Sequence, residues 1–438
     1  MCTKVANTTL LLTATLALVL AACQDVEIDD VVGPILPPST PTGPVHPSTE
    51  WRHYIGDSTD ANYRTSLPER FEDGSTGIVR EVGRQQLQLV RVSPEGEVLL
   101  NDTIDFTDGL PHLNVFGAGQ QGIEEGIFVL NVDREPTGFN FYTGEVAWRS
   151  AGRRGLFVSD AGAVTVKQPE VGEIVVAELD LLTGDEYAIY RVPAAVATTS
   201  LDIAWAYLLS DASGDLYLVT YSTGGTPNDP YGRGIQSVEV RTVPGADVVW
   251  RHTARTSPAY YNFAPAQVGD TLLYALDDTL RAVSLRTGET IWTYGTSTDT
   301  HLDESRQARP TSFTNYPLTV ESEMGIIYGG ESGRYASIDL SSGRHRWSVN
   351  HGMERYSTVQ VYTDAYAAIT PRFNQIAIID PITAEEQGRV DLFARFNSNR
   401  AHHRTFYDAE REDVTIYDGE WVYAVKLDSL IAGRARRQ

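Results

Sequence analysis

The chain has 438 residues, of which 42% are hydrophobic and 10% aromatic, so it has enough apolar side chains to form a large core. Its 35 basic and 58 acidic residues give a formal net charge of -23. A surface this acidic repels nucleic-acid phosphates and anionic lipid headgroups, which excludes both as main partners. The two cysteines, Cys2 and Cys23, both lie near the N-terminus. The rest of the chain therefore has no disulfide, no thiolate nucleophile and no cysteine spacing of a zinc or iron–sulfur site.

Residues 1–22 have the features of a bacterial lipoprotein signal peptide. Lys4 supplies a positive charge, and the apolar stretch 10–20 has the length of a signal-peptide core but is too short to span a bilayer, which needs about 20 apolar residues. The stretch leads into Leu-Ala-Ala before Cys23, which is similar to the lipobox whose cysteine is lipidated and becomes the new N-terminus. We expect the acylated Cys23 to anchor the protein in a membrane. The alternative is an ordinary secretory signal with an incidental cysteine.

Residues 23–50 predict a tether between this anchor and the folded body. Six prolines lie among Ser, Thr and Gly after Gln24, a composition that cannot bury a core and favours extended conformations of about 3.1 Å per residue. Gln24 replaces the aspartate that retains many lipoproteins in the inner membrane, which favours the outer membrane. The acidic run 25–30 is similar to signals that send some lipoproteins to the cell surface. Both the periplasmic face and the cell surface remain open.

A repeated β pattern occupies residues 51–430. In its clearest copy, alternating strands at 271–276 and 279–285 are joined by Asp277-Asp278, and a turn ending in Gly288 leads to a strand that contains Trp292. The Asp pair suits a short hairpin, and Gly288 can adopt the positive φ that the second turn needs. Further turns of this kind are centred on residues 96, 144, 184, 245, 343, 384 and about 428.

The spacing of 40 to 61 residues between these turns is the size of a four-stranded propeller blade. The sequence therefore predicts an all-β, eight-bladed β-propeller of antiparallel blades, with seven blades as the alternative. The basic residues 431–438 form a tail without a strand pattern.

Two residue types recur at the predicted turns. Glycine ends the clearest turns, and an aromatic residue follows four or five positions later, where it can pack against the neighbouring blade and bury about 150–250 Å². The turn glycines are Gly144, Gly184, Gly288 and Gly343, and the predicted blade-docking residues are Trp51, Trp148, Trp250, Trp292 and Trp347. We interpret these tryptophans as structural; the alternative, a ligand-binding role, is less favoured.

The last repeat has no outer strand after residue 428, whereas residues 50–55 alternate like one strand. We expect this N-terminal strand to complete the last blade, which would close the ring and remove an exposed edge.

The segments AVSLRTGETIW (282–292) and ASIDLSSGRHRW (336–347), together with the opening 51–64, resemble blades of the pyrroloquinoline-quinone-like propeller superfamily, which includes quinoprotein alcohol dehydrogenases. The resemblance implies fold more strongly than function. The superfamily contains quinone- and calcium-dependent dehydrogenases and non-catalytic outer-membrane lipoproteins that present loops to partner proteins. The dehydrogenases usually carry an adjacent cysteine pair that stacks on the quinone, and this body has no cysteine. The signal peptide, lipobox and tether match the non-catalytic kind.

Three other patterns are weaker. Residues 117–122 spell GxGxxG, but a strand pattern at 126–130 leaves no room for the helix that a dinucleotide site needs. The pair His402 and His403 lies near four acidic residues, but neighbours on a strand point to opposite faces, so a solvated loop is favoured over a metal site. The loop 222–233, rich in Gly and Pro, is longer than a tight turn and is the preferred contact region.

The sequence thus predicts a non-catalytic scaffold, held at the outer membrane through Cys23, that binds an envelope protein or glycan through propeller loops. It predicts no catalytic residues, metal site or cofactor. The alternative function is a quinone-dependent dehydrogenase or another enzyme with its site in the central channel.

Overall fold

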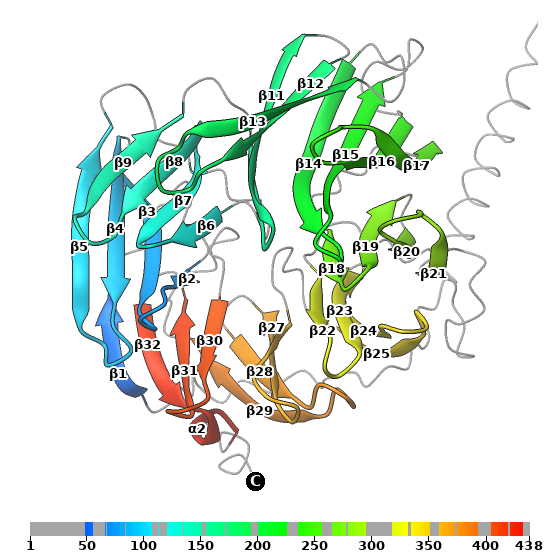
Figure 1. The fold of residues 1–438 in the computed structure, drawn as a ribbon. Coiled ribbons are helices and arrows are strands. Elements are labelled where there is room, and N and C mark those ends of the chain that lie inside the picture. The colour runs from blue at the N-terminus through cyan, green and yellow to red at the C-terminus, as the bar shows by residue number, and fades with distance from the viewer. Residues whose placement is uncertain are drawn as a thin grey trace, which may run out of the picture.

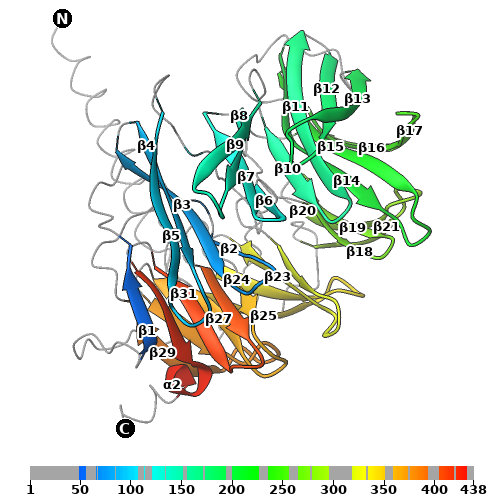
Figure 2. The same cartoon turned by 60° about the vertical axis from the view of Figure 1, so that its left-hand side comes forward.

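Short antiparallel strands make up nearly all of the regular structure. The computed structural model describes residues 49–55, 66, 68–83, 85–106, 113, 121–133, 135–150, 155–170, 173–193, 200–225, 235–255, 265–276, 279–294, 318–331, 334–350, 359–372, 375–392, 404–418 and 421–431. Every named strand in these ranges belongs to one of eight four-stranded sheets. The sheets follow one another around a ring as the blades of an eight-bladed β-propeller (Figures 1 and 2), so the predicted fold is confirmed and the seven-bladed alternative is wrong.

Seven blades are built from consecutive strands. Blade 1 contains β2 (Glu69–Arg70), β3 (Thr76–Gly83), β4 (Gln86–Val92) and β5 (Val98–Asp105). Blade 2 contains β6 (Gln121–Glu124), β7 (Ile127–Val132), β8 (Glu135–Asn140) and β9 (Glu145–Arg149). Blade 3 contains β10 (Leu156–Ser159), β11 (Gly162–Glu170), β12 (Glu173–Leu179) and β13 (Glu186–Pro193). Blade 4 contains β14 (Ser200–Ser210), β15 (Leu216–Gly225), β16 (Ile235–Thr242) and β17 (Val248–Arg255).

Blades 5 to 7 repeat this order. Blade 5 contains β18 (Ala266–Val268), β19 (Thr271–Leu276), β20 (Thr279–Ser284) and β21 (Thr290–Tyr294). Blade 6 contains β22 (Thr319–Glu321), β23 (Ile326–Glu331), β24 (Arg334–Asp339) and β25 (His345–Asn350). Blade 7 contains β26 (Gln360–Val361), β27 (Ala367–Arg372), β28 (Gln375–Ile379) and β29 (Glu386–Asp391).

Blade 8 is assembled from both ends of the folded chain. Its first three strands are β30 (Arg404–Asp408), β31 (Asp413–Tyr417) and β32 (Trp421–Lys426), and its outermost strand is β1 (Thr49–Tyr54), which pairs antiparallel with β32. In Figure 1 the dark blue β1 lies beside the red β32. The expected closure by the N-terminal strand is therefore confirmed. The expected turn near residue 428 is wrong, because the chain there forms the short helix α2 (Leu427–Ile431).

The two middle strands of each blade are buried on both sides, because each blade is packed between two others. All six residues of β7 and all five of β28 are buried, whereas β9, an outermost strand, is mostly exposed. The core is thus distributed around the ring as a series of apolar layers between blades.

The turn before each outermost strand has a reproducible geometry. In blade 3 the carboxylate of Asp180 accepts hydrogen bonds from the backbone N–H groups of Leu182 and Thr183, at 2.8 and 2.9 Å. The N–H of Gly184 then donates to the carbonyl of Asp180, and Gly184 has a φ of 75°. An Asx-type start and a left-handed final residue therefore fix this turn locally. Gly288 shares the left-handed conformation, as predicted, but in blade 4 it is Ala246 and not Gly245 that adopts it.

The two faces of the ring differ in the length of their connections. Because successive strands alternate in direction, the hairpins before the second strand of every blade and before the fourth strand of blades 1 to 7 lie on one face, and the remaining connections join strand ends at the other. The first set is short, as at 160–161 and 180–185, and we call this side the short-turn face. The second set includes residues 106–120, 226–234, 295–318 and 392–403, and we call that side the long-connection face. No helix in the described part of the chain is long and apolar enough to cross a membrane.

Candidate functional site

Five tryptophans join neighbouring blades by the same contact. Each indole N–H donates to a backbone carbonyl in the turn of the next blade. The pairs are Trp51 to Pro94 (2.9 Å), Trp148 to Leu181 (3.0 Å), Trp250 to Leu285 (2.7 Å), Trp292 to Leu340 (2.9 Å) and Trp347 to Pro381 (3.2 Å). In this geometry the ring covers the turn while its polar N–H is satisfied. The tryptophans that the sequence singled out thus lie at blade seams, and their contribution to stability is a prediction for mutagenesis.

The turn glycines lie against these rings. A Cβ placed on Gly184 would be 2.5 Å from the ring of Trp148, and one on Gly343 would be 2.6 Å from Trp292. Gly288 faces Trp250 in the same way. The fourth turn glycine, Gly144, faces Asp102 instead, because the corresponding position of blade 1 holds no tryptophan.

Blades 1, 3 and 7 have no tryptophan at the position that follows the turn. The fourth residue after the left-handed turn position is Leu100 in blade 1, Ala188 in blade 3 and Gly388 in blade 7. At Gly388 the space is taken by helix α2, since an added Cβ would lie 2.3 Å from the carbonyl oxygen of Leu430. The sequence did not predict that α2 would fill this position, because a five-residue helix is too short to produce a recognisable helical periodicity.

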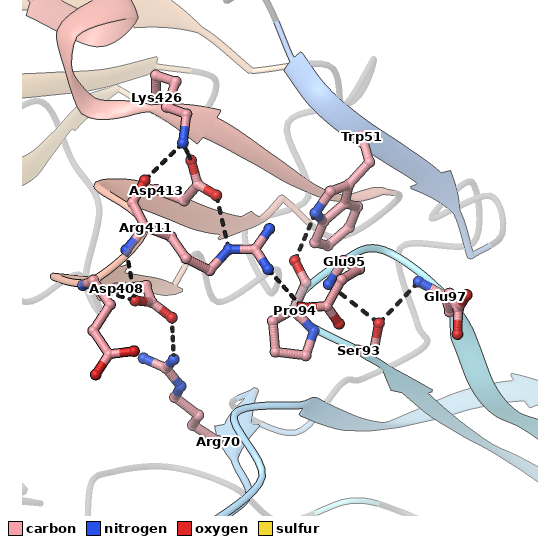
Figure 3. A network of polar contacts seen from close by, with 11 residues as sticks. Trp51, Arg70, Ser93, Pro94, Glu95, Glu97, Asp408, Arg411, Asp413 and Lys426 are labelled. Carbon is pink, nitrogen blue, oxygen red and sulfur yellow. Dashed lines mark hydrogen bonds and ion pairs between the residues drawn. The ribbon is translucent and has the colours of Figure 1, made fainter.

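The closing seam between blades 8 and 1 carries a network of ion pairs (Figure 3). Arg411 contacts Glu95 at 2.6 Å and Asp413 at 3.1 Å. Arg70 contacts Asp408 at 2.7 Å. Burial by itself raises the pKa of the Asp408 carboxyl, but hydrogen bonds from the Arg411 N–H and the Arg70 guanidinium lower this pKa below its ordinary value. These contacts join the two ends of the folded chain, and every member has a partner, so the network is structural.

A cavity of about 480 Å³ opens where blades 3, 4 and 5 meet. It is lined by Val158, Ser159, Asp160, Ala161, Tyr207, Leu209, Ser210, Asp211, Ala212, Pro265, Gln267 and Gly269. Except for Pro265, which directly precedes β18, these residues come from the innermost strands β10, β14 and β18 and from the short turns that follow them. The cavity therefore lies on the short-turn face. Its size falls within the range of small-ligand sites.

One wall of the cavity is a buried carboxylate with several partners. Asp211 contacts the Arg286 guanidinium at 2.9 Å and accepts a hydrogen bond from the Tyr217 hydroxyl at 3.1 Å. Burial alone raises the pKa of the Asp211 carboxyl, but hydrogen bonds from the backbone N–H groups of Ser213 and Asp215 hold it below its ordinary value. The carboxylate is thus kept ionised at the cavity wall. Sequence patterns did not predict this site, because its residues are brought together only by the packing of three blades.

Several polar side chains on the innermost strands form hydrogen bonds to the neighbouring blade. The amide of Gln121 donates to Glu69 in the neighbouring blade at 2.5 Å, and the hydroxyl of Thr319 donates to the carbonyl of Val359 at 2.9 Å. The backbone N–H of Thr405 donates to the Gln360 amide oxygen at 2.7 Å. These side chains bridge adjacent blades and are not left available to a ligand.

The residues that the structure describes form no assembled site for a quinone and a calcium ion. Within the described ranges no three His, Cys, Asp or Glu side chains gather as a metal-ligand set, and the only cysteines are Cys2 and Cys23. At the seams between blades 1 and 2 and between blades 6 and 7, polar side chains of the inner strands bond to the neighbouring blade. No catalytic constellation is evident in the described part of the chain.

Several sequence predictions fall outside the described residues. These are the signal peptide, Cys23, most of the tether, the pair His402–His403, the Asp277–Asp278 hairpin, residues 226–233 of the predicted contact loop and the tail from 432 onward. Of the GxGxxG pattern, Gly122 lies in strand β6, and no helix follows it.

Comparison with known proteins supports the propeller fold. A family model described as outer membrane protein assembly factor BamB matches residues 238–432. Among solved structures, BamB from Moraxella catarrhalis is similar with a TM-score of 0.50 and 11% identity, covering 86% of this chain and 99% of that one. The quinohemoprotein alcohol dehydrogenase from Comamonas testosteroni has a TM-score of 0.57 and 11% identity, covering 86% and 76%.

The likeness extends beyond bacteria. Sqt1 from Saccharomyces cerevisiae has a TM-score of 0.57 and 9% identity, covering 88% of this chain and 99% of that one. No curated protein matches the chain by sequence. At these identities the solved structures establish the fold, which hosts both catalytic and non-catalytic proteins.

Proposed function

We propose that this chain, a β-propeller of the pyrroloquinoline-quinone-like superfamily, is a membrane-anchored binding scaffold and not an enzyme. It would be acylated at Cys23 and delivered to the outer membrane, with residues 24–48 as a spacer. The partner would be a protein of the cell envelope. A glycan partner is a different outcome of the same tests.

The observation that carries this proposal is the difference between the two faces of the ring. The short-turn face is fixed by local hydrogen bonds such as those of Asp180 and Asp339, which leaves little chain for a partner to engage. The long-connection face carries the segments 106–120, 295–318 and 392–403, which exceed what joining two strands requires. Long connections on a rigid framework are where binding residues concentrate.

Charge supports the same assignment. The whole chain carries a net charge of -23, whereas the connections at 295–318 and 392–403 contain four arginines and three acidic residues, together with histidines and aromatic residues. Arginine and aromatic side chains are the types most enriched at protein interfaces. The long-connection face is therefore less acidic than the framework and better suited to a protein surface.

The experiment is a pull-down of the full-length chain from detergent-solubilised membranes. In one variant, residues 226–234 are replaced by Asn-Gly, so that β15 and β16 are joined by a short hairpin like those of other blades. The control changes Ser342, an exposed residue of a short turn, to Gln. We expect the partner to be lost with the shortened connection, retained with Ser342→Gln, and the melting temperature to be similar in both.

The catalytic alternative is tested on the same preparation. The purified chain is titrated with pyrroloquinoline quinone and calcium, and alcohol- or sugar-dependent dye reduction is followed. A stoichiometric absorbance change with dye reduction would replace the scaffold proposal. The anchor is tested separately by labelling with an alkyne fatty acid, which should mark the wild-type chain and not Cys23→Ser.

A further inference from the structure

We infer that the cavity between blades 3, 4 and 5 binds a guanidinium or ammonium group carried on an aliphatic stem. The cavity lies on the short-turn face, whereas the proposed scaffold function uses the long-connection face. The two sites are therefore independent, and either can fail without the other. The inference rests on the hydrogen-bonding capacity, the charge and the shape of the cavity wall.

Two polar side chains of the wall, Gln267 and Ser159, use their donors within the protein and offer acceptors to the cavity. The two amide N–H groups of Gln267 donate to the carbonyls of Ser210 and Gly269, which leaves the amide oxygen as an acceptor. The hydroxyl of Ser159 donates to the carbonyl of Leu208, so only its lone pairs remain. A ligand that binds against these two side chains must therefore supply hydrogen-bond donors.

The wall also carries unneutralised negative charge. Asp211, whose side chain is buried behind the wall, and Asp270, the residue after the lining residue Gly269, share one guanidinium, that of Arg286, at 2.9 and 3.6 Å. Asp160 is exposed at the rim of the cavity and makes no hydrogen bond or ion pair with any residue that the structure describes. The position of Arg286 against Asp211 shows that a guanidinium fits this edge. A cation with several N–H donors satisfies both the charge and the acceptors.

The remaining wall is apolar. Val158, Leu209 and Pro265 line the cavity and give methylene groups a surface out of water, each buried CH₂ contributing about 0.8 kcal/mol. At about 480 Å³ the cavity is large enough for a charged head together with its stem. The chemistry therefore fits either a free alkyl-guanidine or alkyl-amine, or an arginine or lysine side chain of a peptide.

The test uses N-butylguanidinium and its uncharged counterpart N-butylurea, titrated calorimetrically into the purified full-length chain without any partner. We expect N-butylguanidinium to bind to the wild type and the urea to bind at least about tenfold more weakly, a factor that corresponds to 1.4 kcal/mol. Asp160→Asn should weaken N-butylguanidinium by a similar factor. The matched control, Asp364→Asn, removes an exposed carboxylate from the equivalent turn of blade 7 and should leave binding unchanged.

Titration with a peptide decides whether the bound cation belongs to a protein side chain or to a free small molecule. Binding of acetyl-Gly-Arg-Gly-amide with the same Asp160 dependence supports a basic side chain of a protein, and binding of N-butylguanidinium alone supports a free small ligand. Equal binding of the guanidinium and the urea, or no loss in Asp160→Asn, would overturn the inference, as would no binding by any probe. Because Asp160 is exposed, its variant should keep the wild-type melting temperature.

Discussion

The indole N–H of Trp51 donates to the carbonyl oxygen of Pro94 at 2.9 Å, and this contact joins the first strand of the folded chain to the turn of blade 1. Because β1 is at the same time the outermost strand of blade 8, the first described strand holds the last blade against the first (Figure 3). The predicted tether leads directly into this strand. The proposed anchor would therefore be joined directly to the strand that closes the ring.

Removal of residues 51–57 should unfold the ring or lower its melting temperature strongly, because β32 would lose its partner and blade 1 would lose Trp51. Thermal unfolding followed by circular dichroism measures this. Trp51→Phe is the matched milder change, since it retains most of the apolar ring and loses the N–H. A truncated chain with the full melting temperature would show that closure does not depend on β1.

Trp292→Ala should cost about 3–5 kcal/mol, the usual range for a buried large aromatic residue, because the ring is 8% exposed and packs on Gly343. The neighbouring Ile291 is 54% exposed, so Ile291→Ala should change the unfolding free energy by about 0.5 kcal/mol or less. Denaturant unfolding of the two variants gives the comparison. Similar losses in both would mean that Trp292 does not hold the seam.

Gly184→Ala should destabilise the protein for two reasons that can be separated. The positive φ of 75° strains any residue with a Cβ, by about 1–2 kcal/mol, and the added methyl would also collide with Trp148 at 2.5 Å. Gly214→Ala supplies the control, because Gly214 has a φ of 86° and nothing within 4 Å of the added Cβ. The difference between the two losses in unfolding free energy measures the collision, and equal losses would contradict the seam contact.

Stability should fall as the pH drops below about 5. Hydrogen bonds from the Ser341 hydroxyl and the Arg346 guanidinium hold the pKa of the Asp339 carboxyl well below its ordinary value. A carboxyl whose pKa is depressed in the folded state stabilises the protein above the unfolded-state pKa, and this stabilisation is lost as the pH falls toward the folded-state pKa. Asp339→Asn should therefore flatten the decline in melting temperature between pH 5 and pH 3. An unchanged slope would refute this assignment.

The repeat could be predicted from sequence because its signals are local. Turn residues such as Asp180 and Gly288 and the tryptophans after the turns lie within a few positions of each other, so their spacing gives blade size and blade number. The prediction failed where one blade departs from the rest. Residue 428 lies in α2 because Gly388 leaves a space that the helix fills. In blade 4 the left-handed residue is Ala246, which the sequence did not single out, because residues other than glycine rarely adopt a positive φ.

The cavity could not be predicted in this way. Val158, Leu209 and Gln267 belong to three different blades, and no spacing rule relates positions on separate innermost strands. Its acceptor character depends on which N–H groups of Gln267 are already bonded, which is a property of packing.

The scaffold account is tested most directly by photo-crosslinking from the two faces of the ring in intact cells. A photoreactive residue replaces Tyr231 in the long connection of blade 4, and in a second strain it replaces Ser342 in the short turn of blade 6. The account predicts a discrete crosslinked envelope protein from position 231, identified by mass spectrometry, and none from position 342. The same product from both positions, or a product only from position 342, would contradict the assignment of partner binding to the long-connection face.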